Sequence, residues 1–342
     1  MKFSVIVPVY NVQDYLCQCL DSIISQTENS WECICVDDGS SDGSGRICDE
    51  YASRDSRFKV IHQKNYGLPA ARNSGIQVAR GDYLCFIDAD DAVVPEWLES
   101  ASKIIEKTKA DVVRLYLRDW YGDSIPSVIL HDGSPVMVLT GTSEILPWGW
   151  RILSQEAWAV LLFVNRLRLR SFRFTEGMPI HEDAIFALQI LPRIESIASV
   201  RYPGYLYRMR TDSIMHSYIT VDGMLRYWRE LRNTIVGQKE LLVRYGIWQE
   251  VVGIFSRLLY SESRGWSLRR NMAEKHRFGE MSAYLNILIE EGLLDFNEIR
   301  IPWRLVFRFY CRTGNYLPLL LLYHAAIHFI RIRNKFLAKK RV

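Results

Sequence analysis

Short apolar runs alternate with stretches of helical periodicity over residues 3–87. The apolar runs are rich in β-branched and aromatic residues and occupy residues 3–9, 31–36, 58–61 and 83–87. Apolar positions recur at helical spacing between them, at residues 12–26, from 42 onward and at 68–79. Strands that alternate with helices of this length predict a parallel sheet with helices on both faces.

Polar residues follow each of the four apolar runs. They are PVYN at residues 8–11, DDGS at 37–40, HQKN at 62–65 and DADD at 88–91. Ligands bind outside the carboxyl ends of the strands in open sheets of this type, and these ends lie at one edge of the sheet. We therefore expect residues that are far apart in the sequence to converge on one rim.

The pattern becomes less regular after the fourth apolar run. A further strand is expected at residues 111–116, and the apolar spacing over 158–167 predicts a helix. A loop at 175–180 leads to the acidic segment 181–183, which we expect at the start of another helix.

The run Asp88-Ala89-Asp90-Asp91 places three carboxylates at the end of the apolar run 83–87. Carboxylates this close repel each other, and a divalent ion or protonation relieves the repulsion. Hard oxygen ligands suit Mg²⁺ or Mn²⁺, which take one or two carboxylates and then the phosphates of a substrate. The alternative is a solvated turn before a helix, with Asp91 as the N-terminal cap of that helix.

Two further motifs carry candidate binding groups. The segment 37–44, DDGSSDGS, places paired carboxylates after a strand, where Asp38 can accept from a nucleobase N–H or a ribose hydroxyl. The alternative is a turn in which Asp42 caps the next helix. Arg72, near the start of the helix at 68–79, can pair with phosphate or stack on a base, and a surface salt bridge is its alternative.

Composition narrows the class of protein. A hydrophobic content of 49% and a charged content of 24% are typical of a folded protein and exclude a mainly disordered one. The apolar run at residues 1–8 is too short for a signal peptide, which predicts a cytoplasmic protein. The seven cysteines include no C-x-x-C pair and mostly lie in apolar runs, so we expect them to be reduced and buried.

Charge is distributed unevenly along the chain. The formal net charge is +4, yet residues 301–342 contain no Asp or Glu and are rich in Lys and Arg. The apolar run at 316–330 is shorter than the ~20 residues that span a bilayer. It is typical of a helix in the membrane interface, which predicts peripheral contact with the inner face of the plasma membrane. The alternative is a helix that packs on the rest of the protein or on a second subunit.

Two parts of the chain are expected from these patterns. Residues 1–220 should form the α/β domain, and residues 221–342 should form a mainly helical C-terminal region that ends in the basic segment. The pattern contains no internal repeat.

The polar motifs together resemble those of a known family. The resemblance rests on residues 8–11, 36–44, 65–73, 88–91, 176–177 and 182–183. In order and spacing these segments look like the motifs of the family 2 glycosyltransferases of bacterial polysaccharide assembly. The resemblance implies the GT-A fold, an α/β fold with a Rossmann-like, mostly parallel sheet flanked by helices.

The resemblance also implies roles in binding a UDP-sugar. It assigns donor contacts to Pro8, Tyr10, Asp38, Arg72, Asp88 and Arg208. Pro8, Tyr10 and Asp38 would hold uracil and ribose, and Asp88 would reach the ribose or a metal-bound water. Asp90 would bind Mn²⁺ or Mg²⁺, with Asp91 as the alternative ligand. Arg208 would lie near the diphosphate, and a structural surface role is its alternative.

The same resemblance implies a general base. Asp183 would take the proton of the acceptor hydroxyl, and the adjacent Glu182 is the rival for this role. Both are also explained as acids that a helix N-terminus favours through its dipole. The metal would act as a Lewis acid for the departing UDP. Members of this type invert the anomeric configuration, so no covalent sugar–enzyme intermediate is expected.

The expected function is transfer of a sugar from UDP to a hydroxyl of a glycan acceptor, lipid-linked, in cell-surface polysaccharide biosynthesis. A nucleotide-sugar nucleotidyltransferase is the nearest enzyme alternative, but it usually needs a Gly-rich phosphate loop after the first strand, and PVYN is not one. A nucleic-acid-binding module that uses the basic tail is the alternative from another class. Its acidic rim would repel phosphates unless a cation intervened.

Overall fold

The computed structural model describes residues 2–122, 124–128, 130, 134–156, 159–169, 172–178, 181–209, 221–256, 284, 287–288 and 290–293. The chain divides into two compact units, Met1–Ser217 and Tyr218–Val342. The division lies three residues before the domain boundary expected after residue 220. All of the candidate site residues belong to the first unit.

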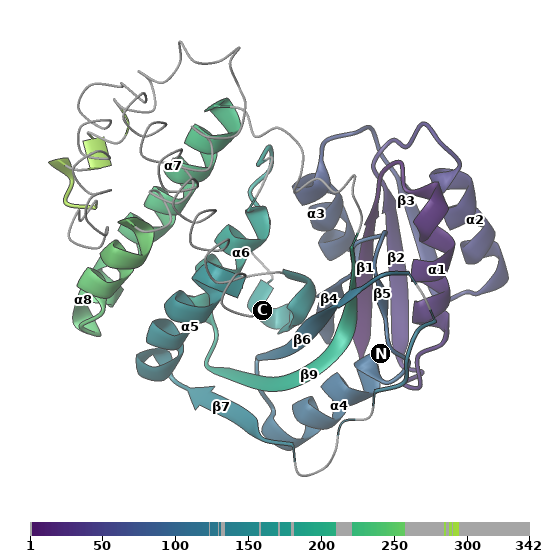
Figure 1. Cartoon of the computed structure of the whole chain (residues 1–342), viewed down its shortest axis with the longest axis horizontal. Coiled ribbons are helices and arrows are strands. Elements are labelled where there is room, and N and C mark those ends of the chain that lie inside the picture. Colours follow the sequence, from purple (N-terminus) through teal and green to yellow (C-terminus); the bar gives the residue numbers. More distant parts are fainter. Residues whose placement is uncertain are drawn as a thin grey trace, which may run out of the picture. The chain divides into compact units, whose positions relative to one another are not determined.

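The described residues of the first unit form a nine-stranded sheet (Figure 1). Its strands are β1 (Phe3–Val9), β2 (Trp31–Asp37), β3 (Phe58–His62), β4 (Tyr83–Phe86), β5 (Ala92–Val93), β6 (Val112–Trp120), β7 (Val136–Thr140), β8 (Leu162–Asn165) and β9 (Ser196–Arg208). The spatial order is β3-β2-β1-β4-β8-β6-β9-β5, with β7 paired to β9. This is the α/β architecture that the alternating pattern predicts.

The half of the sheet from β3 to β4 is parallel. Every residue of β1 and β2 is buried, because helices cover both faces, and such strands appear in the sequence as continuous apolar runs. Val9 pairs with Asp37, which in turn pairs with His62, so three strands end at the same level. The predicted rim therefore exists, and the register of the sheet creates it.

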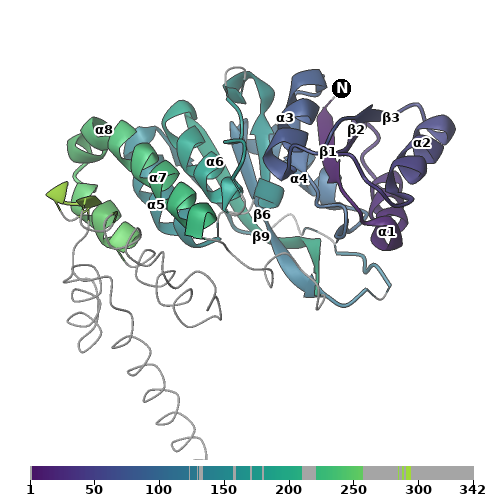
Figure 2. The same cartoon turned by 90° about the horizontal axis from the view of Figure 1, so that it is seen from above.

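Helices cover the two faces of this parallel half. They are α1 (Gln13–Ile24), α2 (Ser44–Arg54) and α3 (Leu68–Val78), and α4 (Trp97–Thr108) follows further along the chain. α3 packs on β1 and β2, whereas α1 and α2 lie on the opposite face (Figures 1 and 2). The expected doubly covered sheet is therefore confirmed, and α4 extends the cover to β6 and β9.

The sheet beyond β4 is mixed, and here one local expectation is wrong. The helix predicted over residues 158–167 is instead a 3₁₀ turn, Ala159–Leu161, followed by β8. β8 runs antiparallel between β4 and β6. Leu162, Phe163 and Val164 are at most 1% exposed, so the apolar run is buried on both faces of a sheet. Short runs of this kind do not distinguish a buried strand from a buried helix.

The remaining described helices of the first unit follow β7 and β8 in the chain, and one of them carries candidate site residues. These are α5 (Thr142–Glu156), the 3₁₀ turns at Arg166–Leu169 and Leu191–Arg193, and α6 (Glu182–Ile190). The acidic pair Glu182-Asp183 begins α6, as the pattern predicts.

The second unit contains α7 (Val221–Gly237) and α8 (Lys239–Arg244) among its described residues. α7 buries Trp228 and Leu231, and the Trp228 ring stacks on Tyr284 with 6.3 Å between ring centroids. Within the described part of the chain we find no helix that could span a bilayer. The basic segment 301–342, with its expected interfacial helix, lies outside the described residues.

Candidate active site

Hydrogen bonds join the strand ends along the rim. The amide of Asp38 donates to Val9 O at 2.9 Å, and that of Ile87 donates to Ile6 O at 3.1 Å. Asn11 has a left-handed φ of 51°, and its side-chain oxygen accepts from Ser41 N at 2.8 Å. Asn tolerates this conformation better than most residues. The ends of β1, β2 and β4 therefore form one connected surface.

Asp38 holds the loop that follows β3. Its carboxylate accepts from the side chain of Gln63 at 2.7 Å, from Tyr66 N at 3.0 Å and from Gly67 N at 2.8 Å. Gly67 has a φ of +91°, which a residue with a Cβ would adopt only under strain. Tyr10 stands beside this region with 49% of its surface exposed, whereas Pro8 is buried within β1. Their assignment to the donor stays a prediction.

His62, at the end of β3, links β2 to α2. Its Nδ1 lies 2.9 Å from Asp37 Oδ2, and its Nε2 lies 3.1 Å from Asp49 Oδ1. These two carboxylates raise the pKa of His62, against a smaller opposing effect of burial. Protonation of His62 is therefore more favourable in the folded protein than in the unfolded chain.

This linkage predicts a pH dependence of stability. Because the folded-state pKa is raised, the stabilisation from His62 is complete below the unfolded pKa of about 6.5 and is lost as pH rises through the folded value. We expect the advantage of the wild type over His62→Gln in free energy of unfolding to shrink between about pH 5.5 and 8.5. Urea titrations at both pH values measure it, and an unchanged difference would contradict the linkage.

The buried Asp91 supports the loop after β4 rather than presenting itself to a ligand. Its Oδ2 accepts from the hydroxyl of Tyr205 at 2.6 Å, and its Oδ1 accepts from Arg208 N at 2.8 Å. Burial, with the nearby charges of Asp90 and Asp88, raises the pKa of Asp91 well above its usual value. A metal would have to displace both bonds, so this geometry disfavours Asp91 as a ligand. The helix-cap alternative is wrong, because β5 follows Asp91 and α4 begins only at Trp97.

Arg208 fixes the same loop from its other side. Its Nε donates to Asp90 O at 2.6 Å, and its Nη2 donates to the side chain of Gln18 at 2.6 Å. The guanidinium also lies 4.3 Å from the ring centroid of Trp120. Arg208 is buried, so its structural contacts lie in the interior and not at the surface, where the alternative had placed them. It contacts the backbone of residues 88–91, which we call the acidic loop. A contact of Arg208 with the diphosphate stays a prediction.

Arg72 joins the acidic loop to the start of α6. Its Nη2 donates to Asp88 Oδ1 at 2.9 Å, and its Nη1 donates to Glu182 Oε1 at 2.6 Å. Burial works against the charge, but Asp88 and Glu182 raise the pKa of the guanidinium above its usual value. Only 2% of Arg72 is exposed, so the alternative of a surface salt bridge is wrong.

The two acids at the start of α6 have different surroundings. Glu182 is buried and paired with Arg72, whereas Asp183 is half-buried and accepts from Ala184 N at 2.7 Å. Asp183 forms no ion pair with any other described residue. Burial and the charge of Glu182 raise the pKa of Asp183 to about 8, although Arg72 opposes the shift. Neighbouring acids with such different environments are typical of an acid–base site.

The backbone just before this pair is unusual. His181 has a left-handed φ of 58° and directly precedes Glu182. Non-glycine residues in this region cost about 1–2 kcal/mol each, and they often lie at functional sites.

The acidic loop has the donor atoms for a divalent cation. Asp88 and Asp90 are half-buried beside the C-terminal end of β4. Over the described ranges, no three His, Cys, Asp or Glu side chains are grouped as a ready metal centre. Mg²⁺ and Mn²⁺ need only one or two carboxylates when substrate phosphates supply further ligands. The donor set therefore fits a metal that binds together with a diphosphate.

Comparisons with known proteins agree with this fold and motif arrangement. The family model described as glycosyl transferase family 2 matches residues 4–152. The chain is 32% identical to the uncharacterized glycosyltransferase EpsJ of Bacillus subtilis over 217 residues, which cover 62% of each chain. It is 33% identical to the putative glycosyltransferase EpsH of the same organism, with 63% of each chain covered. Residues 4–152 therefore form a glycosyltransferase family 2 domain.

The solved structures extend the likeness in fold to most of the chain. The structure of residues 1–349 of S. aureus TarS in complex with UDP-GlcNAc superposes with a TM-score of 0.71 at 21% identity. The match covers 95% of this chain and 92% of the TarS chain. The predicted GT-A fold is therefore confirmed. The aligned part spans less than two thirds of EpsJ and EpsH.

Proposed function

We propose that this protein transfers a sugar from a UDP-sugar to a hydroxyl of a glycan acceptor, with a divalent metal and with inversion at the anomeric carbon. The observation that carries the proposal is the Arg72 bridge, which brings Asp88 of the acidic loop and the Glu182-Asp183 pair to one site. Family membership supports the reaction class. The TarS structures in complex with UDP-GlcNAc and UDP support the class of donor.

The donor end of the site would be the rim formed by β1, β2 and β4. The exposed ring of Tyr10 is available to contact uracil, and Asp38 fixes the loop beside it. Asp88 and Asp90 would hold Mn²⁺ or Mg²⁺, which when bound neutralises charge that develops on the departing UDP. Arg208 and Asp91 keep the loop that carries these ligands in place.

The acceptor end would be the start of α6. The acceptor oxygen attacks the anomeric carbon as the bond from that carbon to the UDP oxygen breaks, and the hydroxyl proton passes to Asp183. Glu182 is less suited to this role, because its carboxylate is engaged by Arg72. Transfer in one displacement leaves the sugar inverted and UDP free, and it needs no covalent intermediate.

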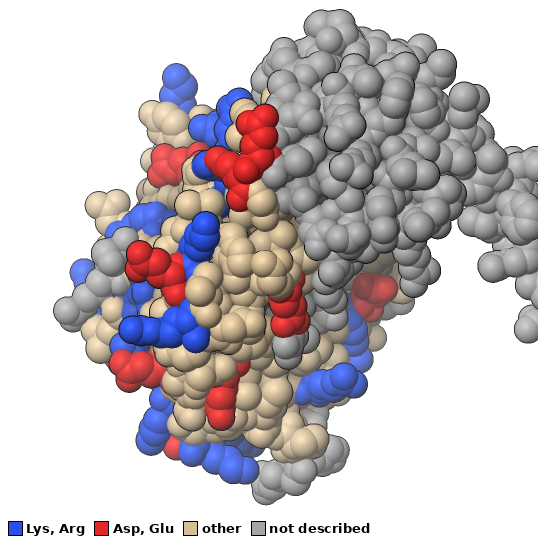
Figure 3. Space-filling view, turned by 90° about the vertical axis from the view of Figure 1, so that its left-hand side faces the viewer, with Lys and Arg blue, Asp and Glu red and all other residues tan. Residues whose placement is uncertain are grey.

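The name of one relative supports a polymer as acceptor. This relative is named poly(ribitol-phosphate) beta-glucosyltransferase, from Bacillus spizizenii, and is 29% identical over 216 residues. A lipid-linked acceptor and peripheral membrane contact through residues 301–342 remain part of the proposal, on the composition of that segment alone. A role in nucleic-acid binding rests on the composition of the segment 301–342 alone. Among the described residues on the face that Figure 3 shows, acidic and basic side chains are interspersed, which does not favour an anionic partner there.

A donor panel tests the proposal directly. We expect one UDP-sugar to release UDP with Mn²⁺ or Mg²⁺, and EDTA to abolish the release. Asp90→Ala should reduce the release at least tenfold, because a metal ligand is lost. Asp82→Ala is the matched control. Asp82 is exposed and directly precedes the first residue of β4, at the end of the strand away from the acidic loop, so this variant should leave the rate unchanged. Absence of UDP release from every donor with every metal would refute the proposal.

A further inference from the structure

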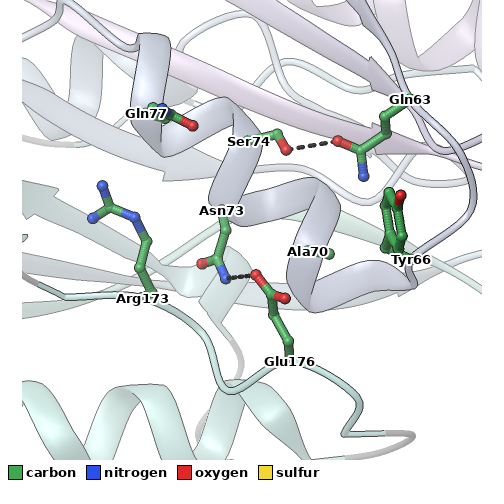
Figure 4. Close-up of a pocket in the computed structure, with 8 residues that line it drawn as sticks. All are labelled: Gln63, Tyr66, Ala70, Asn73, Ser74, Gln77, Arg173 and Glu176. Atoms are coloured by element: carbon green, nitrogen blue, oxygen red, sulfur yellow. Dashed lines mark hydrogen bonds between the residues drawn. The ribbon is translucent and has the colours of Figure 1, made fainter.

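A polar pocket of about 370 Å³ lies on the outer side of α3 (Figure 4). It is lined by Gln63, Tyr66, Ala70, Asn73, Ser74, Gln77, Arg173 and Glu176. Ala70, Asn73, Ser74 and Gln77 form one stripe along the helix, and the others come from the loop after β3 and from residues 172–178. The volume falls in the ~300–1,000 Å³ range of small-molecule sites.

The floor of the pocket is held in place by hydrogen bonds. The Asn73 amide donates to Phe174 O at 3.0 Å and to Glu176 Oε1 at 3.2 Å, and its oxygen accepts from Phe174 N at 2.8 Å. On the other side, the Ser74 hydroxyl donates to Gln63 Oε1 at 2.6 Å. These contacts fix α3 to both flanking loops, so the pocket is formed before any ligand binds.

The lining combines an aromatic ring with hydrogen-bonding groups. Tyr66 is 64% exposed, although its backbone amide is anchored by Asp38. Across the described chain, neither the Gln77 amide nor the Tyr66 hydroxyl has a hydrogen-bond partner in the protein. A sugar ring has apolar C–H faces that stack on an aromatic ring, and hydroxyls that bond to amides and carboxylates. Exposed groups of both kinds side by side are typical of a binding site.

We propose that this pocket binds a neutral sugar unit of the acceptor glycan, distant along the glycan from the unit that reacts. The proposal rests on the glycosyltransferase function proposed above. The pocket and the reaction site share two elements, because α3 also carries Arg72 and the loop 172–178 carries Phe174, whose ring centroid is 5.2 Å from the Arg72 guanidinium. A glycan held here would therefore lie close to the acceptor end of the site.

A phosphate or nucleotide suits the pocket less well. Glu176 contributes a carboxylate that would repel an anion. The guanidinium of Arg173 already donates to Phe172 O at 2.6 Å and to Leu169 O at 3.4 Å. The helix stripe itself supplies only amide, hydroxyl and methyl groups. Uncharged polar ligands match this lining, because each amide can both donate and accept.

Direct binding of defined oligosaccharides tests the proposal. The probes are cellotetraose, maltotetraose and chitotetraose, observed by saturation-transfer NMR on the full chain with saturating UDP. We expect saturation transfer to at least one tetrasaccharide. Gln77→Ala should weaken it about two- to tenfold, as expected for loss of one net hydrogen bond, and Gln77→Trp should abolish it by filling the pocket. Val78→Ala, at the adjacent exposed position outside the pocket, should bind as the wild type does.

The outcomes separate this proposal from the proposed function. If UDP binds but no tetrasaccharide does, or if both Gln77 variants bind as the wild type does, the pocket proposal is refuted and the transferase proposal stands. Displacement of the tetrasaccharide by UDP would also refute it, because the pocket would then belong to the donor. If UDP itself does not bind, the proposed function fails first. Kinetics with two active acceptors that differ in length give a further readout. The Gln77 variants should raise KM for the longer acceptor only, and kcat should stay unchanged for both.

Discussion

Asp183→Asn should lower kcat for sugar transfer by about 10²–10⁴-fold, the usual contribution of a positioned general base. Asparagine keeps the shape and the hydrogen bond from Ala184 N but cannot take a proton. UDP affinity should stay close to that of the wild type, because the donor contacts lie at the other end of the site. Transfer rates with saturating donor, together with calorimetric titration of UDP, measure both quantities.

The pH profile gives a second measure of the same role. The pKa of Asp183 is raised to about 8, and only the deprotonated form can act as a base. The rate should therefore rise as pH increases through this range and then level off. Glu182→Gln is the matched comparison. Burial is the larger cause of the raised pKa of Asp183, and this variant removes the second cause, the charge of Glu182, so the rise in rate should move to lower pH. Lost UDP affinity in Asp183→Asn, or a rate that is independent of pH, would point to a structural role.

Arg72→Met should lower the free energy of unfolding by about 3–5 kcal/mol, as expected when one partner of a buried ion pair is removed. Methionine retains much of the apolar volume of the side chain but leaves Glu182 buried without its cation. Asp88 is affected less, because 35% of its side chain is exposed. Transfer activity should fall as well, since the acidic loop and α6 lose their common anchor.

Two further variants show whether the bridge is the cause. Arg72→Met combined with Glu182→Gln should recover part of the lost stability, because the buried charge is removed together with its partner. Arg80→Met, at an exposed position after the same helix, should change stability by no more than about 0.5 kcal/mol. Denaturant titrations of all four proteins measure the effect. Equal losses in Arg72→Met and Arg80→Met would show that the bridge contributes nothing beyond a surface pair.

The parallel half of the sheet was predictable because its signals are local. Each of its strands is an apolar run bounded by polar residues, and the helices between them have a clear period. The mixed half was not, because β8 and the 13-residue β9 are recruited by partners far away in the sequence. A short apolar run is compatible with either structure until its neighbours are known.

The candidate site shows the same division. The residues at the rim could be predicted from the positions of the strand ends, because parallel strands place their carboxyl ends at one edge of the sheet. The different surroundings of Asp183 and Glu182 could not be predicted from the sequence, since the two are adjacent acids with the same chemistry. Arg72, 110 residues before Glu182, pairs with that residue and leaves Asp183 as the candidate base.

The sequence by itself determined the α/β class, the converging rim and the family motifs, because these depend on periodicity and on the order of residues along the chain. Only the tertiary structure decided the roles of individual charged groups. In the folded protein Asp91 is buried and accepts a hydrogen bond from Tyr205. Arg72 is also buried, and it joins Asp88 to Glu182. A polar pocket lies beside α3. The physical reason is that burial and partners set the energy of a charge, and both come from residues distant in the sequence.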